Sequence, residues 1–162
     1  TISRKRSPTT HQYYLHGQQL KHVDVVTYLG VKIAKDLRWD THVDHISAKA
    51  KKSLNFLRRN IRIGNPQVKQ HAYTSLVRPI LEYSATVWDP HTSSGAQKVE
   101  AIQRRAACFV CNRYRRTSSV TQVMNTLEWQ PLAERRRPAR LMLCDLPEKA
   151  HKSHPLPLGR PQ

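Results

Sequence analysis

The spacing of apolar residues changes along the chain and divides it into segments. Between Tyr13 and Ile33, short runs rich in β-branched and aromatic residues are separated by polar residues and by Gly17. This alternation predicts a small antiparallel meander with a tight turn at Gly17. Two or three strands are marginally stable alone in water, so this unit is expected to join a further sheet.

From Asp40 onward the apolar period is that of an α-helix. One stripe has spacings of three and four residues and consists of Val43, Ile46, Ala50, Leu54, Leu57 and Ile61. Asp40 or Thr41 is expected to cap this helix, because either side chain accepts hydrogen bonds from free backbone N–H groups. Gly64 is expected to end it.

A second helix is predicted to begin at Asn65-Pro66, because Asn supplies a cap and Pro fits the first helical position. Its inward stripe is predicted to consist of Val68, Ala72, Leu76, Ile80, Tyr83 and Val87. Pro79 removes one backbone hydrogen bond, so a kink is expected there. Asp89-Pro90 is expected to stop the helix after Trp88.

Three further helical segments are predicted after a polar loop. The third helix is expected to bury Val99, Ile102, Ala106 and either Phe109 or Val110. The fourth begins near Ser118 or Ser119 and is expected to bury Val120, Val123, Met124 and Leu127. The fifth opens at Pro131 and is expected to break early, at Pro138.

The sequence therefore predicts an α+β fold that is mainly α. A short antiparallel β unit in residues 1–39 is followed by a four- or five-helix bundle in residues 40–137. Residues 138–162 contain repeated prolines and are expected to form a disordered tail. Trp39, Trp88 and Trp129 each close an element; we favour packing at helix junctions for them over stacking on bases.

The charge balance is strongly positive and narrows the function. The 162 residues contain 28 Lys and Arg against 11 Asp and Glu, a formal net charge of +17. Such an excess predicts a polyanionic partner, and nucleic acid fits best; a basic tail or a solvated surface is the alternative. On the polar face of the first helix, no acid follows Asp44, and that face carries Lys49, Lys52, Asn55, Arg58, Arg59 and Arg62. The third helix adds Lys98, Arg104, Arg105 and Arg113. We interpret the one-signed face as a surface for backbone phosphates.

Several chemistries lack their residues in this sequence. Closely placed carboxylates for two-metal catalysis are absent, as are a phosphate-binding glycine loop and a nucleophile elbow. Cys108-x-x-Cys111 has the spacing of one half of a zinc site. We favour the interpretation that both are buried thiols rather than a pair of metal ligands. His42 and His45 are expected to be surface residues. The sequence thus predicts neither catalytic nor metal-binding residues.

The expected location is intracellular, in the nucleus or cytoplasm, and not secreted. Three cysteines are an odd number, and the sequence lacks a charged segment followed by an apolar leader. No apolar run approaches the ~20 residues of a spanning helix, so no membrane partner is expected.

Several short motifs stand in a distinctive order along residues 15 to 137. They are Tyr28-Leu29-Gly30, Trp39 followed by His42, Tyr73-x-x-Leu76, Arg78-Pro79-Ile80-Leu81-Glu82-Tyr83, Val87-Trp88-Asp89-Pro90, Gln103-Arg104-Arg105-Ala106, and Leu127-Glu128-Trp129 with Leu132 and Arg135-Arg136. In this order they resemble the region after the catalytic centre of reverse transcriptases from non-LTR (LINE-type) retrotransposons.

The resemblance implies the end of a polymerase palm followed by a thumb. Residues 26–31, with Tyr28 and Gly30, would then lie close to the primer end. Lys49, Lys52, Arg58 and Arg59 would face the phosphates of an RNA–DNA template–primer duplex. The family's catalytic Asp pair is expected upstream of Thr1, in a missing palm that would carry the Mg²⁺, so this chain is expected to hold no cofactor and to be inactive as a polymerase alone.

The resemblance stops at Pro138, where the family continues a basic helix. The tail is interpreted as a frame change or a foreign exon, and the chain as a truncated, degenerate copy. Two alternatives stay open: a stand-alone basic nucleic-acid-binding protein, and a non-functional pseudogene product of a retroelement.

Overall fold

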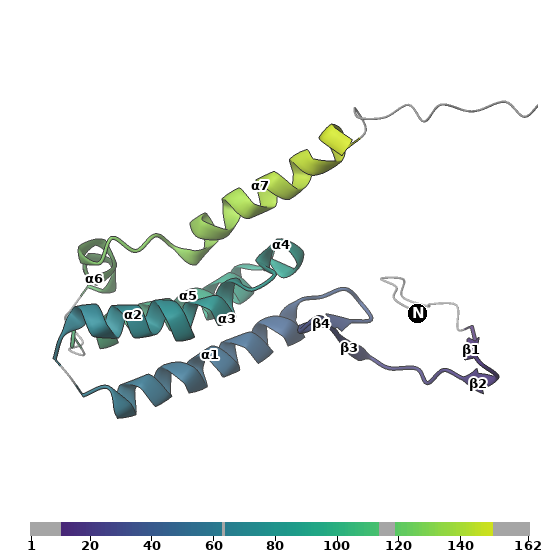
Figure 1. The fold of residues 1–162 in the computed structure, drawn as a ribbon, viewed down its shortest axis with the longest axis horizontal. Coiled ribbons are helices and arrows are strands. Elements are labelled where there is room, and N and C mark those ends of the chain that lie inside the picture. The colour runs from purple at the N-terminus through teal and green to yellow at the C-terminus, as the bar shows by residue number, and fades with distance from the viewer. Residues whose placement is uncertain (1–10, 63, 114–118, 151–162) are drawn as a thin grey trace, which may run out of the picture.

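The computed structural model describes residues 11–62, 64–113 and 119–150 (Figure 1). In these residues the chain forms two strand pairs, β1 (Tyr14–Leu15) with β2 (Gln18–Gln19) and β3 (Val25–Tyr28) with β4 (Val31–Ala34). The helices are α1 (Asp40–Asn60), α2 (Pro66–Leu76), α3 (Arg78–Glu82), α4 (Ala85–Trp88), α5 (Ser93–Val110), α6 (Val120–Thr126) and α7 (Leu132–Ala150). The fold is α+β and mainly α, which confirms the predicted class.

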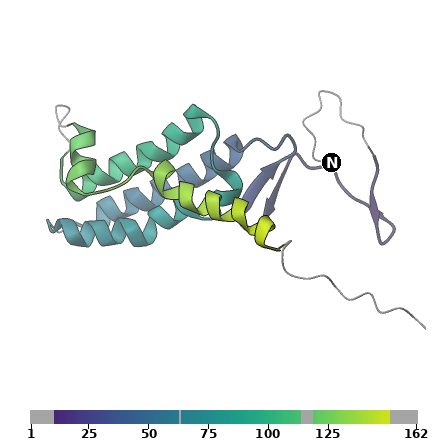
Figure 2. The same ribbon diagram turned by 90° about the horizontal axis from the view of Figure 1, so that it is seen from above.

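The strands form two separate hairpins, so the prediction of one meander is wrong. Each hairpin turns through two residues with positive φ: His16 (48°) with Gly17 (76°), and Leu29 (46°) with Gly30 (79°). This geometry suits the right-handed twist of paired strands. The β3–β4 hairpin lies at one end of the helices, whereas β1–β2 projects away from them (Figures 1 and 2).

Helix α1 buries the stripe that its sequence predicts. Val43, Ile46, Ala50, Leu54 and Leu57 are all buried, and Ile61 is half-buried just beyond the helix. The predicted ends are wrong, however. Trp39 is the N-cap residue, with no side-chain hydrogen bond, and the helix ends at Asn60 rather than at Gly64. The N–H of Ile61 donates to the carbonyl of Leu57, which closes the last turn.

The predicted second helix is divided into α2, α3 and α4. The structure also buries a different face of this segment from the predicted one. The buried residues are Lys69, Tyr73, Val77, Leu81, Ala85 and Trp88. Of the predicted stripe, Val68, Leu76, Tyr83 and Val87 are exposed. Both sets have helical spacing and differ by one residue, so spacing alone does not choose between them. The Asn65 cap is confirmed, since its Oδ1 accepts from the N–H of Gln67 at 2.8 Å.

Lys69 occupies a core position, and no carboxylate of the described residues pairs with it. Its Nζ donates to Oδ1 of Asn112 and lies 5.1 Å from the centre of the Phe109 ring. Asn112 has a positive φ of 52° just after the end of α5. The ammonium therefore lies at the negative end of the α5 dipole, where a cation is stabilised.

Helix α5 lies at the centre of the bundle and contacts α1, α2, α6 and α7. Its predicted inward residues are confirmed: Val99, Ile102, Ala106, Phe109 and Val110 are buried. In α6, which Ser119 precedes, Val123 is buried and Met124 is half-buried. Helices α1 and α7 lie on opposite sides of the layer that contains α2, α3 and α5 (Figure 1).

The tryptophans pack at junctions, as predicted. Trp88 is buried, and its Nε1 donates to the carbonyl of Tyr83 at 2.7 Å. Trp39 and Trp129 are half-buried against the core. The Trp129 ring stacks on Tyr73 with centroids 4.5 Å apart. This stacking fixes the segment between α6 and α7 against α2.

Helix α7 continues through Pro138 to Ala150, so the predicted break at Pro138 is wrong. A proline inside a helix costs about 3 kcal/mol, and tertiary contacts on both sides of it offset this cost. Arg136 and Arg140 flank Pro138 and both bind the Asp89 carboxylate, which follows α4. Of the predicted tail, residues 138–150 are thus helical, and residues 151–162 lie outside the described residues.

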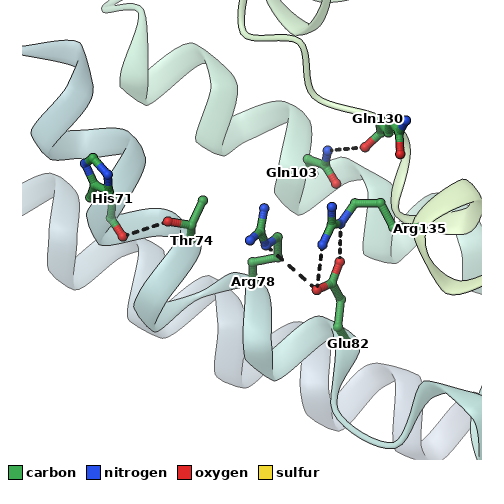
Figure 3. A network of polar contacts seen from close by, with 7 residues as sticks. All are labelled: His71, Thr74, Arg78, Glu82, Gln103, Gln130 and Arg135. Carbon is green, nitrogen blue, oxygen red and sulfur yellow. Dashed lines mark hydrogen bonds and ion pairs between the residues drawn. The ribbon is translucent and has the colours of Figure 1, made fainter. Parts of the chain in front are cut away.

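A second group of ion pairs joins α3 to α7 (Figure 3). The Glu82 carboxylate accepts a hydrogen bond from Nε of Arg135 at 2.6 Å and lies 3.8 Å from Nε of Arg78. Nearby, the side-chain amide of Gln103 donates to the carbonyl of Gln130 at 2.9 Å. These contacts hold the first turn of α7 over α3 and α5.

His42 connects the hairpin to the bundle and is buried, which corrects its predicted place on the surface. Its ring is 1% exposed and lies edge-on to Trp88, with centroids 5.2 Å apart. Its Nδ1 accepts a hydrogen bond from the N–H of Lys32 in β4 at 3.1 Å. Burial lowers the pKa of His42, and the charges of His45 and Lys32 lower it further. The neutral ring is therefore the form that fits the fold.

We expect stability to fall as the pH drops below about 6.5, the ordinary pKa of histidine. Because the folded-state pKa of His42 is depressed, the unfolded chain binds the proton more tightly. The contribution of neutral His42 to stability is fully present above the pKa of histidine in the unfolded chain. It is lost as the pH falls toward the pKa of His42 in the folded chain. In urea unfolding, the urea concentration at the midpoint should fall as the pH is lowered from neutrality toward the range in which carboxylates titrate. In H42N the amide oxygen replaces Nδ1 as an acceptor without titrating, so most of this dependence should vanish. H91N, which changes an exposed histidine away from His42, is the control and should keep the pH dependence. An unchanged pH dependence in H42N would assign the effect to other groups.

Candidate nucleic-acid interface

The outward face of α1 is a basic strip that runs along most of the helix. Lys49, Lys52, Phe56 and Arg59 are exposed and follow one another at spacings of three, four and three residues. Such spacing puts them on one side of a helix, away from the buried stripe. No acidic residue follows Asp44 in α1. We call Lys49, Lys52, Phe56 and Arg59 the outer strip.

Several acidic residues of the described chain bind cations or backbone groups elsewhere in the fold. Asp24 binds Lys35, Asp44 binds Lys98, Glu82 binds Arg78 and Arg135, and Asp89 binds Arg136 and Arg140. Glu100 accepts the N–H of Ala133 at 3.0 Å. Within the part of the chain that the structure describes, Lys49, Lys52 and Arg59 pair with no carboxylate. Their charge is therefore available to an external anion.

The seam between α1 and α5 extends the positive surface. Lys98 of α5 donates to Asp44 of α1 at 2.6 Å, and this contact raises the pKa of the lysine. The two helices run in the same direction (Figure 1). Two turns beyond this pair, helical spacing puts Lys51 on the Asp44 side of α1 and Arg105 on the Lys98 side of α5, and both are exposed. The spacing therefore predicts two further cations along this seam.

Lys51 is a residue that the sequence reasoning missed. It lies seven residues before Arg58 and seven after Asp44, so the three share the side of α1 that faces α5. That spacing was visible in the sequence, but the position of α5 beside it was not. Arg58 is exposed in the last turn of α1, as predicted, next to Arg59 of the outer strip.

Arg62 and Arg104 do not belong to the basic face of α1. Arg62 is exposed but follows the end of α1, because the helix stops at Asn60. Arg104 lines a groove of about 470 Å³ between α5, α6 and the start of α7, together with Met124 and Trp129. Its neighbour Arg105 lies on the α1 side, so the structure separates two adjacent arginines that the sequence grouped.

Tyr28 and Gly30 form the tip of the β3–β4 hairpin. Tyr28 is exposed, and Gly30 has the positive φ that its turn requires. The hydroxyl of Tyr83 donates to the carbonyl of Leu29 at 3.1 Å and holds the tip beside the end of α3. The outer strip begins two turns into α1, beyond His42. The hairpin tip is thus packed against the helices, but among the described residues no contact joins Tyr28 to Lys49, Lys52 or Arg59.

The described residues include possible metal ligands and two thiols. Among them, no three His, Cys, Asp or Glu side chains gather closely enough to hold a metal ion. Cys108 and Cys111 are half-buried thiols, and burial raises the pKa of Cys111, which disfavours its reactive thiolate. No helix in the described ranges combines the length and apolar character that crossing a bilayer requires.

Comparison with known proteins assigns the chain to no group. No protein-family model matches it, and neither a curated protein nor a solved structure is significantly similar to it.

Proposed function

We propose that this chain grips a nucleic-acid duplex through its backbone phosphates, as the thumb of a retroelement reverse transcriptase whose catalytic palm is a separate part. In this proposal α1 lies along the duplex, and the β3–β4 hairpin is the end of the palm. The chain has no polymerase activity by itself, and any Mg²⁺ belongs to the palm. The template–primer duplex and that palm are its partners.

The observation that carries the proposal is the unpaired charge of the outer strip. Three cations on one exposed helix face have no carboxylate partner in the described residues, although acids elsewhere are paired across elements. Phosphate contacts supply affinity without reading sequence, and a polymerase needs such a grip to move along its template. The motif order from Tyr28 to Arg136 supports the assignment to the thumb.

A stand-alone nucleic-acid-binding protein is the second candidate. The bundle has its own core, in which Val77, Leu81, Val99 and Ala106 are buried together. A domain with its own hydrophobic core is in principle able to fold alone. The two candidates differ in one assay: added palm fragment should restore primer extension only if the chain is a polymerase thumb.

The test of the grip is the salt dependence of binding to an RNA–DNA hybrid. The variant K49Q/K52Q/R59Q should bind at least about tenfold more weakly at low salt, because three phosphate contacts are lost. The slope of log affinity against log salt should fall by about 2–3. Fluorescence anisotropy between about 50 and about 200 mM salt measures both quantities.

The matched control removes the same charge from other surfaces. K21Q/R38Q/R137Q changes three exposed cations that lie outside α1, and it should keep most of the salt slope. If both triple variants lose affinity equally, net charge alone drives binding and the outer strip has no special role. If the unmodified chain, folded by circular dichroism, does not bind the hybrid at low salt, the proposed function is wrong.

A further inference from the structure

The outer strip contains one large apolar side chain, Phe56. Its side chain is 57% exposed, although the apolar stripe of α1 is buried on the other side of the helix. Lys52 precedes it by four residues and Arg59 follows it by three, so a cation lies one turn away on either side. Phe56 thus stands in the middle of a basic surface with its ring available to solvent.

We propose that Phe56 is a stacking platform for an unpaired base, and this inference rests on the proposed function. A ligand for this site combines a flat apolar surface with negative charge on both sides of it. A nucleotide within a strand has this chemistry, because its base lies between two phosphates. Aromatic rings between Lys and Arg residues are the usual means of holding single-stranded nucleic acid.

The base that stacks on Phe56 must be outside a double helix. Within a duplex each base is already covered by its neighbours, so exposing it costs unstacking and unpairing energy. Lys52 and Arg59 lie about 10 Å apart along the helix axis, which leaves room for one base between the phosphates that they bind. Phe56 therefore distinguishes a duplex with a single-stranded extension from a blunt one, whereas the cations alone do not.

A protein partner is the competing occupant of an exposed phenylalanine. Leu76 of α2 is also exposed, and its carbonyl accepts a hydrogen bond from Ser53, one turn before Phe56. An apolar protein surface would use both side chains. The nearest cation to Leu76 in sequence, Arg78, is paired with Glu82, so Leu76 lacks the free charges that flank Phe56. The flanking charges favour the nucleotide.

The experiment compares a blunt RNA–DNA hybrid with the same hybrid carrying a single-stranded extension that contains the fluorescent base 2-aminopurine. The unmodified chain should bind the extended hybrid more tightly and quench its fluorescence. F56A should lose about tenfold in affinity for the extended hybrid and lose the quenching, while its affinity for the blunt hybrid stays unchanged. F56Y should retain both, and L76A, the matched control, should behave like the unmodified chain.

Each other outcome has a distinct meaning. If the unmodified chain binds both hybrids equally, or F56A still quenches, Phe56 does not stack and only the present inference is wrong. If L76A loses as much affinity as F56A, the two side chains act as one apolar patch and the inference is again wrong. If the folded chain binds neither hybrid, the proposed function itself fails, and the inference with it.

Discussion

Replacing Asp89 by alanine is expected to lower the free energy of unfolding by about 3–5 kcal/mol. Asp89 binds Nε of Arg136 at 2.7 Å, and the arginine side chain is only 2% exposed. The guanidinium also lies over the Trp88 ring, 5.9 Å from its centre, and its Nη1 has no hydrogen-bond partner among the described residues. Removing the carboxylate leaves a buried charge without compensation. Urea unfolding measures the loss.

The double variant D89A/R136M separates a broken ion pair from a general loss of packing. Methionine fills much of the space of arginine without its charge, so the double variant should recover a large part of the stability. D24A is the control, because Asp24 pairs with Lys35 on the surface and its loss should cause no measurable change. If D89A is as stable as D24A, the Asp89–Arg136 pair does not hold α7 to α4.

Replacing Leu81 by alanine is expected to cost about 2–5 kcal/mol, whereas the same change at Leu76 should cost less than about 0.5 kcal/mol. Leu81 is 0% exposed and Leu76 is 53% exposed. The sequence pattern predicted the opposite, since Leu76 belonged to its inward stripe. Equilibrium unfolding of L81A and L76A therefore tests which face of the α2–α4 segment is buried. Equal costs would contradict the burial described above.

The α1 and α5 helices show how much of the fold a local pattern determines. Each has an apolar stripe opposite a strongly polar face, so only one orientation buries the apolar side chains. The predicted inward residues Val43, Leu54, Val99 and Ile102 are buried. The Asn65-Pro66 start of α2 was also predictable, because capping depends on atoms within one helical turn.

The segment from Pro66 to Trp88 shows where a local pattern fails. Apolar residues occupy both faces there, and the residue that begins the buried set is a lysine. Its burial depends on Phe109 and Asn112 at the far end of α5, which no window around Lys69 contains. Likewise, His42 was placed on the surface because β4 and Trp88 come from other parts of the chain.

Some residues of the candidate interface could be predicted from local spacing, whereas others required the packing of the helices. Lys49, Lys52 and Arg59 follow from helical spacing within α1, and the structure keeps them together on an exposed face. Arg104 and Arg105 are adjacent in sequence, yet the groove beside Trp129 and the α1 seam separate them. Lys51 gains its significance only from the packing of α5, because Lys51 lies on the same side of α1 as Asp44, which binds Lys98 of α5.

By itself the sequence determined the mainly helical class, the central α1 and α5 stripes and the positive outer strip, because each depends on spacing within one element. Tertiary structure decided which face of α2–α4 is buried, the continuation of α7 past Pro138 and the pairing of acids that leaves the strip unneutralised. Those features depend on contacts such as Asp89 with Arg136 and Asp44 with Lys98, between residues about fifty positions apart. No local stretch of sequence contains both partners of such a contact, and only the folded chain brings them together.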